Sequence, residues 1–263
     1  MRILFIGDIF ASIGRRVLAQ RLAPLLQERG IDCCIANGEN AAGGHGLTGR
    51  LVKRLRKYGV AVLTGGNHSF SIPDPDRSFM DLPYVLRPLN FPPGNIGHGS
   101  TLHTLDDGRT VGVVNLQGRT FLHEALDCPF RIGKAAIDDL ANRTKIIIVD
   151  FHAEATSEKL AFATWINGAA SAVIGTHTHV QTADERILAG GTAFISDAGM
   201  TGPEESVIGM KAGEVIHRFI YQTHIRYEPS TRGAMLNAVV VDIDDATGKA
   251  RTIERIYERI ALS

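Results

Sequence analysis

The stretch Gly175-Thr176-His177-Thr178-His179 places two histidines one residue apart, directly after the short apolar run Ala172-Val173-Ile174. Such an apolar run is typical of a buried strand. If the backbone stays extended beyond it, side chains two residues apart point to the same side. Two imidazole nitrogens would then lie close enough to bind one metal ion or two adjacent ions. A pair of surface-loop histidines is the alternative for this motif taken alone.

Other strand-like runs in the chain also end near a side chain that can bind a metal. Residues 2–7, 31–36 and 60–63 are apolar runs that alternate with helical patterns. Strands and helices in alternation predict a parallel sheet with right-handed crossovers. The carboxyl ends of parallel strands lie at one edge of such a sheet, where open α/β sheets bind their ligands. We therefore expect the polar side chains that follow these runs to meet in one site.

The candidate ligands follow predicted strands by one to four residues, and one of these strands is expected at residues 145–149. Carboxylate, carboxamide and imidazole groups without a thiolate suit Mn²⁺, Fe or Zn²⁺ better than a structural cysteine site for zinc. Seven ligands exceed the needs of one tetrahedral ion, which indicates two ions. They are Asp8, Glu39, Asn40, Asn67, His152, His177 and His179, and His68 stands beside them.

The ligand set predicts phosphoester hydrolysis. Two divalent ions against the two carboxylates, Asp8 and Glu39, leave an excess of about two positive charges, which attracts a phosphate. Ions about 3.5–4 Å apart can hold a hydroxide nucleophile between them and clamp the phosphoryl group that it attacks. Single positions have other interpretations, because Asp8 could cap the first helix and Asn40 could occupy a left-handed turn.

The remaining segments are predicted to complete one domain, residues 1–263. Residues 71–98 show little periodicity and predict a long ordered loop or lid, and residues 101–116 predict a β-hairpin. Ser12 is expected to cap the first helix, which Gly30 ends. Further helices are expected at residues 48–58, 131–142 and 157–167, one more strand at 192–195, and antiparallel strands at 219–227, 235–243 and 251–256.

Composition is that of an ordinary soluble globular protein, with 44% hydrophobic and 21% charged residues. The 28 basic and 28 acidic residues balance, so no global field attracts nucleic acid and phosphate recognition is local. No apolar run approaches the ~20 residues that span a bilayer, and Asp8 interrupts the signal-peptide-like start. The odd set of three cysteines indicates thiols in a reducing compartment. We predict a cytoplasmic protein.

Together these motifs resemble the pattern of the calcineurin-like metallophosphoesterases, written D-x-H, G-D-x-x-D, G-N-H-D/E, H and G-H-x-H. The matching residues are Asp8, Gly66-Asn67-His68, His152 and Gly175-Thr176-His177-Thr178-His179. The resemblance implies an α/β fold, a single-domain sandwich of central β-sheets flanked by helices in α/β/β/α layers.

Departures from the pattern resemble one branch of that family, the YmdB-type 2′,3′-cyclic-nucleotide phosphodiesterases. Phe10 stands where D-x-H has its histidine, Asn37-Gly38-Glu39-Asn40 replaces G-D-x-x-D, and Ser69 replaces the acid after the catalytic histidine. The similarity covers nearly the whole chain. Further stretches that fit this branch are Gly7-Asp8-Ile9, residues 150–159 and residues 197–203.

The resemblance implies a role for each candidate residue. One ion would be held by Asp8, Glu39, Asn40 and His179, and the other by Glu39, Asn67, His152 and His177, so that Glu39 bridges them. His68 would be catalytic, as a proton donor to the leaving-group oxygen or a hydrogen-bond donor to the phosphoryl group. The two divalent ions per chain would be Fe or Mn, with Zn as an alternative.

The predicted function is hydrolysis of small phosphodiesters, above all 2′,3′-cyclic nucleotides, by a metal-bridging hydroxide. Neither a membrane nor a long nucleic acid is expected as a partner, and a homo-oligomer is compatible with the sequence. The alternatives are a phosphomonoesterase on the same centre and a non-catalytic nucleotide-sensing protein. A metallopeptidase is disfavoured because H-E-x-x-H is missing. Glu154 and Asp197 are expected to support the site, and surface or packing positions are expected for His45, His98, His103, His123, His217 and His224.

Overall fold

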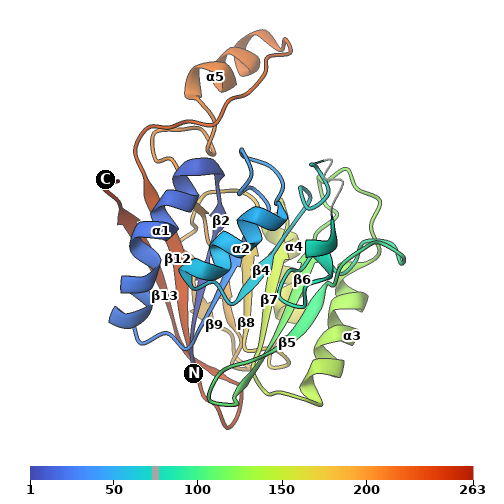
Figure 1. Cartoon of the computed structure of the whole chain (residues 1–263). Helices are drawn as coiled ribbons and strands as arrows, with labels where there is room; N and C mark the ends of the chain where they lie inside the picture. The colour runs from blue at the N-terminus through green and yellow to red at the C-terminus, as the bar shows by residue number, and fades with distance from the viewer. Residues whose placement is uncertain (73–76, 263) are drawn as a thin grey trace.

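Two β-sheets pack face to face in the computed structural model, which describes residues 1–72 and 77–262, and helices cover their outer faces (Figure 1). The strands are β1 (Arg2–Ile6), β2 (Asp8–Ile9), β3 (Cys33–Asn37), β4 (Val62–Thr64), β5 (Ser100–Thr104), β6 (Thr110–Gln117), β7 (Ile147–His152), β8 (Ala172–Thr176), β9 (Arg186–Ile187), β10 (Ala193–Ile195), β11 (Met200–Thr201), β12 (Met235–Ile243) and β13 (Ala250–Arg259). The helices are α1 (Ala11–Glu28), α2 (Gly49–Tyr58), α3 (Pro129–Ala141), α4 (Thr156–Trp165) and α5 (Ala212–Tyr221), with a 3₁₀ turn η1 at Ser78–Asp81.

The first sheet has the strand order β13-β12-β1-β3-β4 and the second has the order β5-β6-β7-β8-β10-β9. In the first sheet β1, β3 and β4 run parallel, as the alternation of strands and helices predicts. In the second sheet β6, β7, β8 and β10 run parallel. The expected hairpin forms as β5 and β6, and the expected C-terminal antiparallel pair forms as β12 and β13.

Alternation of side chains along the strands creates three apolar layers. In β1, Ile3 and Phe5 pack between the two sheets, whereas Leu4 and Ile6 pack on the opposite face against α1 and α2. This is the two-residue period of a strand that is buried on both faces. A third layer joins the second sheet to α3 and α4. The layers therefore follow the order α/β/β/α, which confirms the predicted sandwich.

The predicted strand at residues 219–227 is wrong, because residues 212–221 form α5 instead. Ile216, Phe219 and Ile220 have the i, i+3, i+4 spacing of one helical face. They are 51%, 74% and 64% exposed, since α5 lies on an arm that projects from the sandwich (Figure 1). The short apolar run misled the prediction because its composition alone does not distinguish a strand from a helix.

The start of α1 also differs from the prediction. The helix begins at Ala11, before Ser12, and its N-cap residue Phe10 makes no side-chain cap. The backbone N–H of Ala11 instead donates to the carbonyl oxygen of Asn40 at 2.9 Å. The first helix is therefore tied directly to the loop after β3.

The predicted loop at residues 71–98 contains the 3₁₀ turn η1, and its residues 73–76 lie outside the described part of the chain. Its backbone pairs with β4, since Leu63 N donates to Tyr84 O at 2.8 Å and Leu86 N donates to Leu63 O at 2.7 Å. The guanidinium of Arg87 donates to the carbonyl oxygens of Pro88 and Ile96. Among the described residues, no helix is both long and apolar enough to cross a membrane.

Candidate metal centre

Three predicted ligands surround one ring nitrogen of His152, the last residue of β7. Its Nε2 lies 3.1 Å from Glu39 Oε1, 2.9 Å from Asn67 Oδ1 and 3.1 Å from His177 Nδ1. Donor atoms of Glu39, His152 and His177 all lie within 4.8 Å of one another, an arrangement that could hold a metal ion. These residues follow or end strands of both sheets, so the sandwich itself brings them together.

The other predicted ligands lie beside this group. Asn40 Nδ2 is 3.4 Å from Asp8 Oδ1, 3.3 Å from Glu39 Oε1 and 3.1 Å from His179 Nε2. His179 Nε2 is 3.8 Å from Asp8 Oδ1. Glu39 contacts members of both groups. The structure thus brings all seven predicted ligands to one place.

The two histidines of the opening motif converge by a route that differs from the prediction. Their backbone is not extended, since φ is 104° at His177 and 66° at His179. These values lie in the left-handed region, which is strained for residues with a Cβ. The close approach of Gly175 to β10 needs a glycine, because a Cβ there would lie 1.8 Å from Ser196 O. The conformation of this loop therefore sets the directions of the His177 and His179 rings.

A buried hydrogen-bonded chain sets the proton position on His152. The Thr176 hydroxyl donates to Asp150 Oδ1 at 2.7 Å, so its oxygen accepts from His152 Nδ1 at 2.9 Å. With a proton on Nδ1, Nε2 is the ring nitrogen that faces Glu39, Asn67 and His177 and that could bind a metal ion. Burial raises the pKa of Asp150 to about 6, and its carboxylate also accepts from Thr64 Oγ1 and Asn37 Nδ2.

The other two imidazoles are oriented in the same way. His177 Nε2 lies 3.0 Å from Glu154 Oε2, and His179 Nδ1 donates to the carbonyl oxygen of Ile208 at 2.8 Å. Their remaining nitrogens, Nδ1 of His177 and Nε2 of His179, face the other donors. Such outer partners orient imidazole ligands at metal sites. Carboxylate, amide and imidazole groups gathered this closely in the interior are a set that fits divalent metal ions.

The pKa values of Glu39 and His152 show that positive charge is favoured at this site. Burial alone would raise the pKa of Glu39, but the adjacent His152 outweighs it and lowers that pKa to about 2. Burial alone would lower the pKa of His152, but Glu39 raises it to about 9. A proton held there would have to leave when a metal ion binds. Burial and the neighbouring His152 lower the pKa of His177 to about 3, so this ring is neutral.

A tight turn brings Asn67 and His68 into the site together. Ser69 N donates to Gly66 O at 3.1 Å, and His68 N donates to Glu39 Oε2 at 3.0 Å. A Cβ on Gly66 would lie 2.3 Å from that same carboxylate oxygen, so the turn needs glycine. His68 Nδ1 lies 3.0 Å from Ser71 Oγ, and burial lowers the pKa of the His68 ring. Ser71, rather than Ser69, therefore orients this imidazole.

Two aromatic neighbours of the site are His45, which sequence reasoning missed, and Phe10, which the D-x-H pattern already placed there. The exposed ring of His45, predicted as a surface or packing residue, lies 6.0 Å from the His68 ring. Phe10, which replaces the histidine of D-x-H, packs edge-on against His179 with ring centroids 5.6 Å apart. The signal for His45 was the run Gly43-Gly44-His45-Gly46, because its three glycines have positive φ and fold the loop back.

A buried ion pair supports the loop that carries the two histidines. Lys159 Nζ donates to Asp197 Oδ2 at 2.9 Å, and both side chains are almost fully buried. The same oxygen accepts from Thr178 N at 3.0 Å, between the two histidines. Asp197 Oδ1 accepts from Gly199 N at 2.8 Å. Asp197 thus has the supporting position that the sequence predicts, and Lys159 is a partner that the sequence did not reveal.

A two-sheet sandwich whose strand ends bring together carboxylate, amide and imidazole donors defines a metallophosphoesterase of the calcineurin-like class. The chain belongs to the YmdB-like protein family, whose family model matches residues 4–256.

Relatives of known sequence and structure agree with this placement. The chain is 46% identical over 256 residues to a 2′,3′-cyclic-nucleotide 2′-phosphodiesterase of Bacillus subtilis, a match that covers 97% of this chain and 96% of the relative. It resembles the crystal structure of a novel phosphatase from Mycoplasma pneumoniae with a TM-score of 0.92 and 34% identity, over 98% of this chain and 93% of that one. A hypothetical protein from Thermus thermophilus matches with a TM-score of 0.89 and 37% identity, over 98% and 99% of the two chains.

We predict that Lys159→Met lowers the free energy of unfolding by about 3–5 kcal/mol, because it leaves Asp197 buried without its cation. Urea denaturation measures the change. Lys134→Met is the matched control, since Lys134 pairs with Asp138 on the surface of α3, and its loss is expected to cost no more than about 1 kcal/mol. Equal small losses in the two variants would contradict a supporting role for the buried pair.

Proposed function

We propose that this chain is a dinuclear-metal phosphodiesterase that hydrolyses 2′,3′-cyclic nucleotides. The observation that carries the proposal is the position of Glu39, because one buried carboxylate oxygen contacts both groups of predicted ligands, through the Asn40 amide in one group and the His152 imidazole in the other. A carboxylate shared in this way is suited to bridge two cations. The name of the Bacillus subtilis relative, which is similar over almost its whole length, supports the substrate class.

The two donor groups suggest how the ions would be held. One ion would be bound by the group around Asp8 and His179, and the other by the group around His152 and His177. Oxygen and imidazole donors suit Fe or Mn, with Zn as the alternative. Such ions would supply an activated water and neutralise charge on the attacked phosphate. The full proposed sets are Asp8, Glu39, Asn40 and His179 for one ion, and Glu39, Asn67, His152 and His177 for the other.

His68 is proposed to donate a proton or hydrogen bond to the substrate. Its backbone N–H is held by Glu39 and its Nδ1 faces Ser71, which leaves Nε2 as the atom available to a ligand. A 2′-phosphodiesterase breaks the bond between phosphorus and the ribose 2′ oxygen, and an alkoxide leaving group needs a proton. A positioned imidazole can supply one.

A phosphatase for monoesters is the second candidate, and the likeness to the Mycoplasma pneumoniae protein, which is described as a novel phosphatase, favours it. The same centre could serve either reaction, so substrates decide between them. Turnover of 2′,3′-cyclic AMP with release of 3′-AMP that is not degraded further supports the diesterase. Release of inorganic phosphate from 3′-AMP that is faster than turnover of 2′,3′-cyclic AMP would instead identify the protein as a monoesterase. A cytoplasmic setting is also proposed, and the free thiols of Cys33, Cys34 and Cys128 support it.

The bridging role of Glu39 can be tested with Glu39→Gln, which keeps the volume and removes the charge. We expect metal content to fall to one ion or none per chain and hydrolysis to be almost lost, because the amide no longer offsets two cations. Elemental analysis and turnover of 2′,3′-cyclic AMP measure both. Glu254→Gln, in a surface pair with Arg29, is the control and should behave as the unmodified chain. Two ions per chain with full turnover in Glu39→Gln would show that Glu39 does not bridge the ions.

His177 and His179 are predicted to serve different ions although only one residue separates them. His177→Ala and His179→Ala should therefore each deplete a different metal position. Anomalous scattering from crystals of the two variants locates the ion that remains. Loss of the same single ion in both variants would instead establish a mononuclear centre.

His68→Ala should retain both ions and lose at least about a hundredfold in turnover, the low end of the range for removal of a positioned acid. The loss should be smaller for a nitrophenyl ester, whose leaving group needs less protonation. His217→Ala on the projecting α5 is the control and should leave turnover unchanged. Equal losses on both esters with metals intact would assign His68 to phosphate stabilisation, and lost metal would make it a ligand.

A further inference from the structure

Helix α2 carries a stripe of positive charge on its exposed face. Five of its ten residues are basic and none is acidic, although basic and acidic residues balance over the whole chain. Leu51, Val52 and Leu55 form the buried face. The exposed cations recur at positions i, i+3, i+4 and i+7, so they lie along one side of the helix. These four residues, here named the basic stripe, are Arg50, Lys53, Arg54 and Lys57.

The charges of the basic stripe are not neutralised by the described residues around them. None of its four side chains forms an ion pair within residues 1–72 and 77–262, whereas Arg21 and Arg29 of α1 pair with Glu258 and Glu254. Arg15 of α1 adds to the field, since its pKa is lowered first by burial and then by the nearby cations, Arg54 among them. Like charges at helical spacing repel one another, and an anion would relieve that repulsion.

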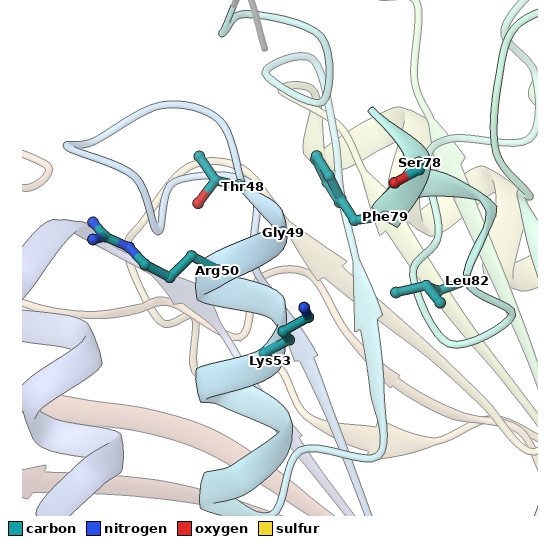
Figure 2. A pocket seen from close by; sticks show the side chains of 7 residues that line it. All are labelled: Thr48, Gly49, Arg50, Lys53, Ser78, Phe79 and Leu82. Atoms are coloured by element: carbon teal, nitrogen blue, oxygen red, sulfur yellow. The ribbon is translucent and has the colours of Figure 1, made fainter. Parts of the chain in front are cut away.

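A cavity of about 660 Å³ opens at the N-terminal end of the basic stripe. Thr48, the N-cap of α2, and Arg50 and Lys53 of α2 line one side, and Ser78 and Phe79 of η1 line the other. In Figure 2 the guanidinium of Arg50 extends along the surface away from η1. The volume is within the usual range for small-ligand sites. The predicted metal ligands take no part in its lining. The cavity is therefore distinct from the metal centre.

The loop between β3 and α2 connects the cavity to the metal centre. It begins with Glu39 and Asn40, continues to His45 beside His68, and ends at Thr48 on the cavity wall. Thr48 follows His45 by three positions, a reach of at most about 11 Å. The basic stripe then extends a further ~10 Å along the helix, at 1.5 Å per residue. A ligand with several phosphates spaced along a chain could span this path.

We infer that the cavity and the basic stripe bind the 5′-side phosphates of a short oligoribonucleotide whose 2′,3′-cyclic phosphate terminus lies at the metal centre. The inference rests on the proposed function and extends its substrate class from mononucleotides to RNA ends. A 2′,3′-cyclic phosphate occupies the 3′ end of a ribonucleotide, so any further nucleotides leave the site on its 5′ side. Lysine and arginine in a groove follow the backbone of a single strand without reading its sequence.

The kinetic test compares 2′,3′-cyclic AMP with a triadenylate that ends in the same cyclic phosphate. At low salt we expect kcat/KM to be roughly tenfold higher for the triadenylate, because local positive charge raises the association rate. In Arg50→Gln/Lys53→Gln the ratio of the two kcat/KM values should fall towards one. Arg143→Gln, an exposed cation beside a different cavity, is the matched control and should keep the ratio. A ratio near one in the unmodified protein, with cyclic AMP turned over, would overturn the subsite and leave the proposed function standing.

Direct binding decides the inference even if neither compound is hydrolysed. The fluorescence anisotropy of labelled hexaadenylate should report binding that weakens with salt. The slope of log affinity against log salt should be shallower by about 1.4 in Arg50→Gln/Lys53→Gln, which is about 0.7 for each of two lost phosphate contacts on a single strand. An unchanged slope would refute the subsite. If polyglutamate of matched charge binds as tightly as hexaadenylate, the ligand class is an acidic peptide and the inference of an RNA strand is wrong.

Discussion

The constraint on which the rest of the structure depends is a buried group of electron-pair donors that only cations can satisfy. Glu39 is ionised in the interior, with a pKa lowered to about 2 despite burial, and the ring of His152, whose pKa is raised to about 9, lies 3.1 Å from it. Isolation of a carboxylate from water costs several kcal/mol unless it is compensated. A proton on His152 compensates it in part, and divalent ions would do so fully. Under the proposed function, the same carboxylate would affect both stability and hydrolysis.

The backbone around these donors is held by partners that have no chemical role of their own. His177 and His179 both have positive φ, a cost that the surroundings must offset. The Lys159–Asp197 pair fixes the amide between them, and Gly175 lets the strand end approach β10. On the other side, the Asp150–Thr176 chain sets the tautomer of His152. Because these partners are buried, they hold the backbone around the donors in place.

Most of the fold and all seven converging donors could be predicted from the sequence, because apolar runs mark the strands and parallel strands share one carboxyl edge. The predictions that were wrong concern the local conformation of short segments. The apolar run that includes Phe219 and Ile220 predicts a strand, because the composition of a short run does not show that it lies on an exposed helix. The extended geometry expected at His177 failed because a loop's φ values are set by distant contacts such as Lys159–Asp197. His45 was missed because only the folded loop places it beside His68.

Charge is distributed unevenly in a chain whose net charge is zero. Around the amino end of the chain, cations are neutralised, since Arg109 pairs with Asp32 and Asp107, and the N-terminal ammonium pairs with Asp245. Beside the metal centre, α2 presents cations without such partners among the described residues. Carboxylates buried among imidazoles would let the centre accept metal ions, and an excess of metal charge would then attract phosphate. Unpaired cations nearby extend that attraction, so a neutral protein can still steer a polyanion to one place.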